Sequence, residues 1–220
     1  MMKLVSTPRI DFLRELASEI LGVYGLGRTV VAVDGTDAAE RAAFADDLAA
    51  VFDEREHPVF RASLRDFRHS RAEQERSGPE SPERLLRHLY DFSLLRRVLL
   101  DPFRLGGSTG FVTRAFDADR DTWVEPTWLT GPPDATLIVD GEYLNRKELR
   151  DLWSYSVLVE TEADAVRFGP GGDDNDSDPV NEHVVADRLY RGQVRPRSRA
   201  TAVVDLSNPD DPRRLFLDSC

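Results

Sequence analysis

The sequence predicts an α/β fold in which helices cover both faces of a mostly parallel β-sheet. Two apolar, β-branched runs, TVVAVD (residues 29–34) and TLIVD (residues 136–140), do not alternate with polar residues and therefore indicate strands buried on both faces. Segments with apolar residues at three- and four-residue spacing alternate with such runs, as in sheets with crossover helices. The 220 residues are enough for one domain of this class.

Four further elements are predicted in the first half of the chain from the spacing of apolar residues. They are an amphipathic helix over residues 8–24, a helix marked by residues 44–52, a strand over residues 58–63 and one long helix over residues 82–102. Gly25 and Gly27 follow the first helix, and Pro82 suits the first turn of the last one. The connection before Pro82 is polar and rich in arginine.

The second half continues this alternation after an insertion rich in glycine and aromatic residues. The stretch FVTRAF (residues 111–116) alternates apolar and polar residues, so residues 105–133 are predicted to form a hairpin-like excursion from the sheet. The other predicted elements are a strand over residues 136–140, a short helix over residues 145–153, a strand over residues 155–161, a helix over residues 180–191 and a strand over residues 201–206. Residues 168–179 are acidic and glycine-rich, and we expect a mobile loop there.

The composition argues against several classes of function. The chain has 40 acidic and 29 basic residues, a net charge of −11, which disfavours a nucleic-acid partner because phosphate backbones attract concentrated positive charge. The apolar runs are too short for a bilayer and the first ten residues lack a signal-peptide core, so we expect a cytoplasmic protein without a membrane partner. The single cysteine, Cys220, excludes an intrachain disulfide.

The turn after the first buried strand has the context of a phosphate-binding loop. Backbone N–H groups at a helix N-terminus point toward an anion, and the motif G-x-x-x-x-G-K-[ST] adds a lysine and a hydroxyl around the phosphates. Residues 35–42 read GTDAAERA. Gly35 matches the first position, but Glu40, Arg41 and Ala42 stand where the second glycine, the lysine and the hydroxyl belong.

Together with this loop, several segments resemble the uridine kinase-like family of P-loop nucleoside kinases. The matching motifs are VAVDG and FADDLA (within residues 31–49), ASxxxF (62–67), YDxxxLRRxLLDP (90–102), FD (116–117), PPDAxLIVDGxxLxRxELRDxW (132–153) and RLY (188–190). The resemblance runs from about residue 29 to residue 215 and implies a P-loop NTPase-like fold. It also implies ATP and Mg²⁺ as cofactors, and phosphoryl transfer to a nucleoside.

The resemblance also implies a domain organisation. The expected parts are an amino-terminal helix in residues 1–28 packed on a domain of residues 29–220, with the hairpin-like excursion near residues 105–130 and a lid-like loop near residues 168–180. In such kinases a lid supplies arginines that close over the transferred phosphoryl group. Here the lid segment keeps Arg167 and then becomes acidic.

Carried onto this chain residue by residue, the family's catalytic set is incomplete. In such kinases an aspartate after the second strand acts as base, whereas here Arg65 stands at that position and Asp66 follows it. Glu40 adds repulsion where the loop must attract phosphate. The candidates that the resemblance leaves are Asp66 and Asp140 for catalysis, Asp140 also for magnesium, and Gly35, Thr36, Asp37 and Arg41 for the nucleotide.

Each candidate also has a purely structural interpretation. The loop is either a degraded nucleotide site or an ordinary strand-to-helix turn with Asp37 near the N-cap. Asp140 and Glu142 are either metal or substrate ligands or carboxylates solvated at a strand end. Arg65 and Asp66 are either a shifted base or a surface ion pair.

Other chemistry-bearing residues give weaker signals. The acidic run 173–178 lacks the glycine and glutamate that a calcium loop requires, and the four histidines have no metal-ligand spacing. Phe111, Trp123 and Trp128 either line a ligand cleft or pack within the hairpin.

We therefore expect a pseudokinase, a uridine kinase-like protein that has lost phosphoryl transfer and keeps a binding or regulatory role. Its partners would be a nucleotide or other small-molecule ligand and a protein. The alternative is an active, divergent ATP-dependent kinase of a nucleoside or another small hydroxyl substrate, with Arg41 as phosphate contact, Asp66 as base and Asp140 as magnesium ligand. A third interpretation is a structural subunit without a small-molecule ligand.

Overall fold

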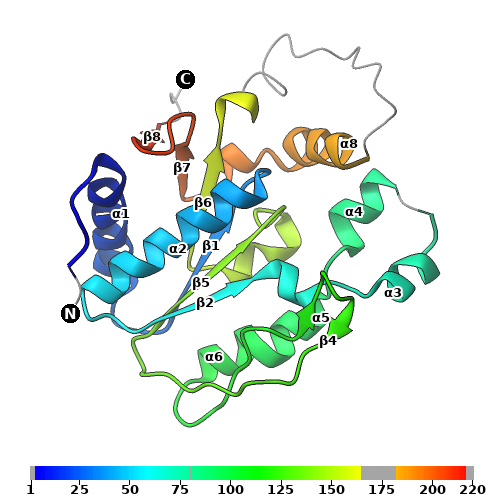
Figure 1. Ribbon diagram of the computed structural model, residues 1–220, viewed down its shortest axis with the longest axis horizontal. Coiled ribbons are helices and arrows are strands. Elements are labelled where there is room, and N and C mark those ends of the chain that lie inside the picture. Colours follow the sequence, from blue (N-terminus) through cyan, green and yellow to red (C-terminus); the bar gives the residue numbers. More distant parts are fainter. Residues whose placement is uncertain (1–2, 80, 165–181, 217–220) are drawn as a thin grey trace.

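A six-stranded sheet with the strand order β2-β5-β1-β6-β7-β8 forms the centre of the molecule (Figure 1). The structure is a computed structural model that describes residues 3–79, 81–164 and 182–216. The strands of this sheet are β1 (Thr29–Asp34), β2 (Val59–Ser63), β5 (Thr136–Gly141), β6 (Tyr155–Glu160), β7 (Ala202–Asp205) and β8 (Arg213–Leu215). All pairings are parallel except that of β7 with β8, which confirms the predicted fold class.

The two β-branched runs lie side by side at the middle of the sheet. β1 pairs with β5 on one side and with β6 on the other, so that Val31 lies opposite both Ile138 and Tyr155. Every residue of β1, β5 and β6 is buried. The absence of polar alternation in these runs therefore reflects burial on both faces.

Two long helices cover one face of the sheet. They are α1 (Pro8–Tyr24), with the predicted bounds, and α2 (Ala38–Glu54). The Thr7 hydroxyl accepts a hydrogen bond from the Ile10 N–H and caps α1. Val31 and Val33 of β1 pack in one core with Phe44 and Leu48 of α2.

The opposite face is covered by shorter helical segments. These are α5 (Phe92–Leu95), the π-helical η2 (Arg96–Leu100), α6 (Asp101–Leu105) and the 3₁₀-helical η3 (Lys147–Leu152). Val30 and Ala32, the alternate residues of β1, pack there with Leu95, Leu99 and Phe103. Helices therefore cover both faces of the sheet, as the sequence predicts.

The prediction of one long helix from Pro82 to near Pro102 is wrong in two respects. The helix is interrupted after His88, and helical structure continues beyond Pro102. It breaks after α4 (Pro82–His88), because the carboxylate of Asp91 accepts a hydrogen bond from the Leu94 N–H, 2.8 Å away, and starts a new helix. The new helix continues past Pro102 to Leu105, since the proline stands in the first turn of α6, where its missing N–H is tolerated.

The remaining elements lie around the sheet. They are η1 (Leu64–Phe67), α3 (Arg71–Arg76), β3 (Phe116–Asp117), β4 (Thr122–Trp123), α8 (Glu182–Leu189), η4 (Tyr190–Val194) and η5 (Pro196–Ser198). β3 and β4 form an antiparallel hairpin within the predicted excursion. α4 and α8 pack together in a small core with Leu85, Tyr143 and Ala186. The loop expected over residues 168–179, with Arg167 and the acidic run, lies outside the described residues.

β1 stands at the point where the strand order reverses. The chain leaves β1 toward β2 and β5 on one side, and β6 flanks β1 on the other. In open α/β sheets, ligands bind in the crevice outside the carboxyl ends of the strands at such a point. None of the described helices has the length and apolar character needed to cross a membrane.

Candidate functional site

Gly35 places the loop after β1 directly against β6. A Cβ atom at this position would lie 2.6 Å from Val159 Cγ2 and 2.8 Å from the Val159 carbonyl oxygen. Both distances are too short for a side chain, and the second contact is with backbone that cannot rotate away. The glycine is therefore required by the close approach of the loop to the neighbouring strand.

The amide groups at the start of α2 are already hydrogen-bonded. Asp37 is the N-cap residue, and its Oδ1 accepts hydrogen bonds from the Ala39 and Glu40 N–H groups, both at 2.9 Å. These are N–H groups of the kind that a bound phosphate would need at a helix N-terminus. Asp37 is thus the N-cap that the structural interpretation of the turn places near this position.

Arg41, at the position of the loop lysine, is folded into the protein. The residue is only 6% exposed, and its Nη1 donates a hydrogen bond to the Gly35 carbonyl oxygen. Its Nε lies 3.6 Å from Asp140 Oδ2 and has no hydrogen-bond partner among the described residues. The charge of the guanidinium group is therefore compensated within the protein.

Asp140 is not solvated at the strand end, contrary to the structural interpretation that the sequence allowed. It is 2% exposed, and its Oδ1 accepts a hydrogen bond from Arg61 Nη2 at 2.9 Å, while Ser63 Oγ donates to Oδ2 at 3.2 Å. The reason is the register of the sheet, which places Ser63 of β2 directly opposite Asp140 of β5. With Arg41, Asp140 forms a buried cluster of two guanidinium groups around one carboxylate.

This cluster does not fit Mg²⁺. Magnesium binds through carboxylate oxygens together with several waters, and two guanidinium groups beside the same carboxylate oppose a further cation. Within the part of the chain that the structure describes, there is no group of three or more His, Cys, Asp or Glu side chains that could hold a metal ion.

Thr36 connects the loop to the segment after β6 and, through Asp164, to η4. Its hydroxyl donates a hydrogen bond to Asp164 Oδ1, and Asp164 Oδ2 accepts one from the Thr161 N–H at 2.9 Å. Arg191 Nη2 lies 3.4 Å from Asp164, and its Nη1 donates to Glu160 at 2.7 Å. The candidate phosphate ligand Thr36 is thus part of an internal polar network.

Asp34, the last residue of β1, is a buried carboxyl group that the sequence analysis did not single out. It is 1% exposed, and its Oδ2 accepts hydrogen bonds from the Tyr190 hydroxyl and from Asn145 N and Nδ2, the latter two at 3.1 and 2.7 Å. Its Oδ1 has no partner among the described residues. Burial raises the pKa of Asp34 above its usual value. An aspartate at the end of an otherwise apolar strand is the signal that could have found it.

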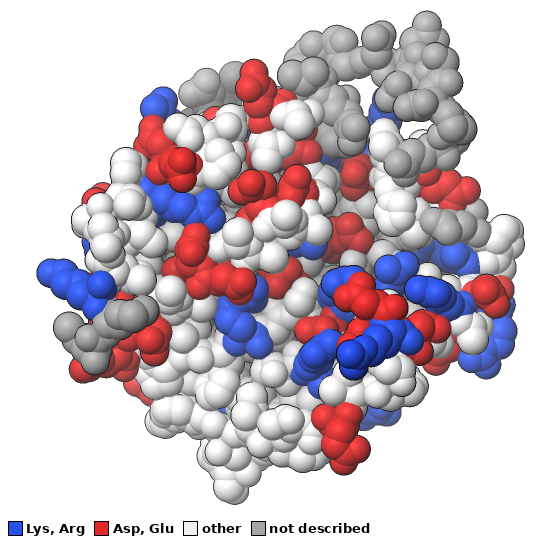
Figure 2. Space-filling model, in the orientation of Figure 1, with Lys and Arg blue, Asp and Glu red and all other residues white. Residues whose placement is uncertain are grey.

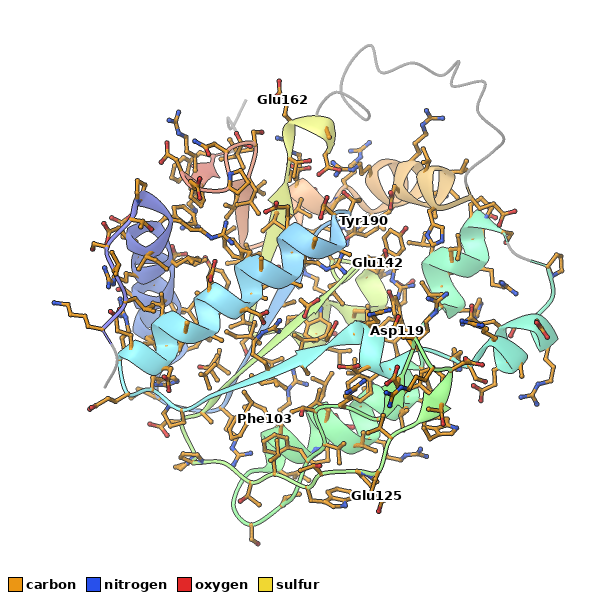
Figure 3. The ribbon with its side chains drawn as sticks, viewed as in Figure 1. Phe103, Asp119, Glu125, Glu142, Glu162 and Tyr190 are labelled. Atoms are coloured by element: carbon orange, nitrogen blue, oxygen red, sulfur yellow. The ribbon has the colours of Figure 1, made fainter. Side chains whose placement is uncertain are left out.

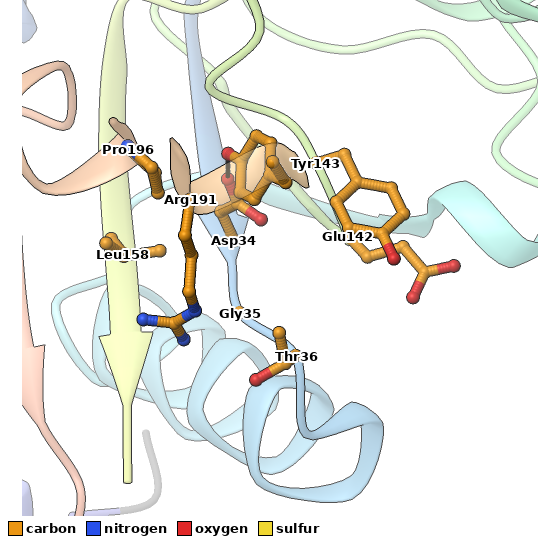
Figure 4. Close-up of a pocket in the computed structure, with 9 residues that line it drawn as sticks. Asp34, Gly35, Thr36, Glu142, Tyr143, Leu158, Arg191 and Pro196 are labelled. Carbon is orange, nitrogen blue, oxygen red and sulfur yellow. Dashed lines mark hydrogen bonds between the residues drawn. The ribbon is translucent and has the colours of Figure 1, made fainter. Parts of the chain in front are cut away.

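Asp34, Gly35 and Thr36 line one narrow pocket that has no room for even a water molecule. Glu142 lines it as well, as does Arg191, whose side chain extends along the loop toward Thr36 (Figure 4). The side chains at the carboxyl end of β1 are therefore packed closely together.

Asp66 and Arg65 do not pair with each other, and each forms an ion pair with a residue of the excursion instead. Arg65 pairs with Asp119 of the hairpin, on the side of the molecule labelled in Figure 3, and Arg114 Nε lies 3.2 Å from Asp66 Oδ1. The hairpin supplies both partners, although it is distant in sequence. Burial raises the pKa of Asp66, the charge of Arg114 opposes that shift, and the charge of Asp140 adds to it.

The aromatic candidates of the excursion pack in different ways. Phe111 is buried between Phe60 and Phe103, with ring centroids 4.9 and 5.3 Å away, as core packing requires. Trp123 contacts Phe116 with ring centroids 5.5 Å apart, but Trp123 and Trp128 are 57% and 63% exposed. Neither tryptophan lines the pocket at the end of β1.

The strand order, the glycine turn and the helix after β1 define an open α/β fold with a nearly all-parallel sheet. No protein-family model matches the chain, and no curated protein matches it. Among solved structures, one described as a possible uridine kinase from Bacillus stearothermophilus is similar with a TM-score of 0.69 and 22% identity, over 89% of this chain and 96% of that chain. D-glycerate 3-kinase from Cryptococcus neoformans is similar with a TM-score of 0.52 and 10% identity, over 94% of this chain and 99% of that chain. These likenesses show the fold.

Proposed function

We propose that this chain is a P-loop kinase-like protein that has lost phosphoryl transfer and keeps a binding or regulatory role. The observation that carries the proposal is the position of the Asp37 carboxylate, which accepts hydrogen bonds from the Ala39 and Glu40 N–H groups at 2.9 Å. An incoming phosphate would have to displace this carboxylate against the repulsion of two negative charges. The chain is similar in fold to structures described as small-molecule kinases. In this proposal the fold is retained and only the chemistry of the site has changed.

The pairing of the arginines supports the same conclusion. Phosphoryl transfer depends on positive groups that neutralise the developing charge on phosphate oxygens. Arg41 lies against Asp140 and the Gly35 carbonyl oxygen, and Arg61 donates to Asp140. Both positive charges are therefore compensated before any ligand arrives. Arg41 also differs from the loop lysine in shape, since a planar guanidinium group does not replace a compact ammonium group.

One observation favours the alternative of an active, divergent kinase. The pKa of Asp66 is raised by burial and by the charge of Asp140, and a carboxylate with a raised pKa is a better general base. Asp66 follows β2, close to the carboxyl edge at which β1 and β5 end. If the chain transfers phosphoryl groups, Asp66 is the residue that would accept the proton of the substrate hydroxyl.

The two proposals are separated by turnover. We would incubate the chain with Mg²⁺-ATP and a panel of nucleosides, glycerate and sugars, and follow product formation. Asp66→Asn is the test variant and Asp119→Asn, which changes the exposed carboxylate paired with the preceding Arg65, is the matched control. The pseudokinase proposal predicts no product that depends on Asp66. Product that Asp66→Asn abolishes and Asp119→Asn preserves would establish the active kinase instead.

A further inference from the structure

A cavity of about 450 Å³ lies between α1 and the strands β7 and β8 at one edge of the sheet. Its most buried lining residues are apolar, Leu16 of α1 with Ala202 and Val204 of β7. Phe12 of α1 and Phe216, which follows β8, line it as well, and Phe216 is 80% exposed. The volume lies within the range of about 300–1,000 Å³ that is usual for small-molecule pockets.

The cavity lies on the same side of the sheet as α1. Val204 packs in the core beneath this helix, and it lies opposite Arg214 in the pairing of β7 with β8. Residues opposite each other in neighbouring strands project to the same face, so Arg214 also lies on the α1 side. There its Nη2 donates a hydrogen bond to Glu19 Oε1 at 3.2 Å. This ion pair joins the helix to β8, and the cavity lies beside it.

The charged side chains that line the cavity are compensated except for Glu15. Glu19 pairs with Arg214, whose hydrogen bond lowers the pKa of Glu19, so that both groups are charged and their charges cancel. Arg213 pairs with Asp211 at 2.9 Å. Glu15 is exposed and forms no hydrogen bond or ion pair with the residues that the structure describes. The cavity therefore combines an apolar surface with one negative charge that has no positive partner there.

We propose that this cavity binds a small organic ammonium ion that carries an aromatic group. The aromatic group replaces water on the apolar surface and packs between Phe12 and Phe216, and the ammonium group forms an ion pair with Glu15. The Arg214 guanidinium group lies 5.7 Å from the centre of the Phe216 ring and positions that ring beside the cavity. Glu15 would repel an anion of the same shape, so the charge of this residue sets the class of ligand.

The electrostatics of the whole chain also favour a cation at this place. The net charge is −11, which attracts positive ligands. Basic side chains on the face drawn in Figure 2 gather over α3, α4 and the hairpin, on the opposite side of the molecule from α1 and β8. A cation that approaches the cavity therefore does not meet them.

The cavity is separate from the loop of residues 35–42. Its lining residues belong to α1, β7, β8 and Phe216, whereas the loop follows β1, and β6 lies between β1 and β7 in the sheet. Binding of an amine needs neither ATP nor a metal ion. A failed amine titration would therefore leave the proposal of a lost kinase activity unchanged, and phosphoryl transfer would leave this site unchanged.

The test is a calorimetric titration of the full chain with phenethylamine, whose ammonium group is charged at neutral pH. Each comparison ligand changes one property: phenethyl alcohol is neutral, hydrocinnamate is an anion and ethylamine lacks the aromatic ring. We expect saturable binding of phenethylamine with a Kd of about 1 mM or below, and at least about fivefold weaker binding of each comparison ligand. The amide NMR signals of α1 and β7 should shift on addition of phenethylamine, which locates the ligand.

Two variants with matched controls test the residues, and all four side chains are exposed. Glu15→Gln should weaken phenethylamine at least about fivefold and leave phenethyl alcohol unchanged, whereas Glu125→Gln on the excursion (Figure 3) should change neither by more than about twofold. Phe216→Ala should weaken both ligands at least about threefold, because their aromatic group loses a packing surface. Leu26→Ala, which removes another exposed apolar side chain, should leave both unchanged.

Three results would overturn the proposal. The first is the absence of saturable phenethylamine binding to the wild-type chain, and the second is an equal loss in Glu15→Gln and Glu125→Gln. The third is a dimer that Phe216→Ala dissociates, measured by analytical ultracentrifugation, because a second copy of the chain would then cover the cavity.

Discussion

Arg41 Nε lies 3.6 Å from Asp140 Oδ2 where β1 and β5 end, and both side chains are almost completely buried. The resemblance to nucleoside kinases assigns the first position to the lysine that binds ATP and the second to the carboxylate beside magnesium. In this chain the two positions bind each other, and Arg61 completes the compensation of charge on Asp140 at 2.9 Å. At the place where a kinase would keep its ligands, the buried charges of this chain thus compensate one another, and removal of one partner would leave the others uncompensated.

Asp37→Ala should destabilise the protein by about 1 kcal/mol, within the usual range of 0.5–2 kcal/mol for an N-cap. The variant leaves the Ala39 and Glu40 N–H groups without their acceptor. Asp37→Ser, which keeps a capping oxygen, is the control and should recover most of the loss. Urea unfolding measures both variants. Equal stability of Asp37→Ala and wild type would show that the cap contributes nothing.

Gly35→Ala should destabilise the protein by about 1–3 kcal/mol, because the new methyl group would overlap the backbone of β6. The distance to the Val159 carbonyl oxygen would be 2.8 Å. Gly22→Ala is the matched control, since Gly22 lies within α1 and has open space around its Cβ position. It should stabilise the protein by about 0.5–1 kcal/mol. Thermal unfolding of the two variants should therefore shift in opposite directions.

Asp187 should make the protein less stable as the pH rises from about 4 to about 6. Burial raises the pKa of Asp187 to about 6, while a hydrogen bond from Tyr143 and the charge of Arg191 oppose the shift and the charges of Glu142 and Asp164 add to it. In this interval the folded protein holds a proton on Asp187 that the unfolded chain has released. The free energy of unfolding therefore falls with pH there and levels off above about 6.

The variant Asp187→Asn isolates this effect, because its amide oxygen can still accept the hydrogen bond from Tyr143 but cannot ionise. The unfolding temperature of Asp187→Asn minus that of wild type should increase between pH 4 and pH 6.5 and then stay constant. Thermal unfolding at half-unit pH steps measures the difference. A difference that does not change with pH would contradict the assignment. Asp187→Ala, which loses the hydrogen bond to Tyr143 at every pH, serves as the comparison.

Replacing Glu40→Gly, Arg41→Lys and Ala42→Thr together should create nucleotide binding. The changes remove a repelling carboxylate and supply the lysine and hydroxyl of a phosphate-binding loop at the N-terminus of α2. Mg²⁺-ATP at 100 times its Kd would add about 2.7 kcal/mol and raise Tm by about 5–10 °C for a chain of this length. The same ATP should leave the wild-type Tm unchanged. No shift in a normally folded triple variant would show that the loop geometry itself has diverged.

The central strands of the sheet and the bounds of the first helix follow from local sequence. Uninterrupted β-branched runs predicted β1 and β5, and the glycines after residue 24 predicted the end of α1. The helix break at Asp91 was missed because the apolar spacing continues across it, although an aspartate is a strong cap. The short strand β8 was missed because its residues, RRL, have no apolar alternation.

The loop of residues 35–42 could be located from sequence, but the pairings of its side chains could not. The position of Arg41 followed from the loop motif, whereas its contact with Asp140 depends on β1 and β5 being neighbours. Arg61, a charged residue inside the strand β2, was the available sign of a buried partner for a carboxylate. Asp66 and Arg65 find their partners on the hairpin, which no local pattern connects to η1.

Calorimetric titration of the wild-type chain with Mg²⁺-ATP is the most direct test of the claim that the phosphate and metal positions are satisfied by the chain itself. A second titration with ATP and EDTA shows whether any binding depends on the metal. The account predicts no saturable heat up to about 1 mM ATP, the upper end of the usual range for enzyme substrates, in either titration. Saturable, magnesium-dependent binding with a Kd below about 0.1 mM would contradict it, since that affinity requires the N–H groups of α2 and a free carboxylate at Asp140.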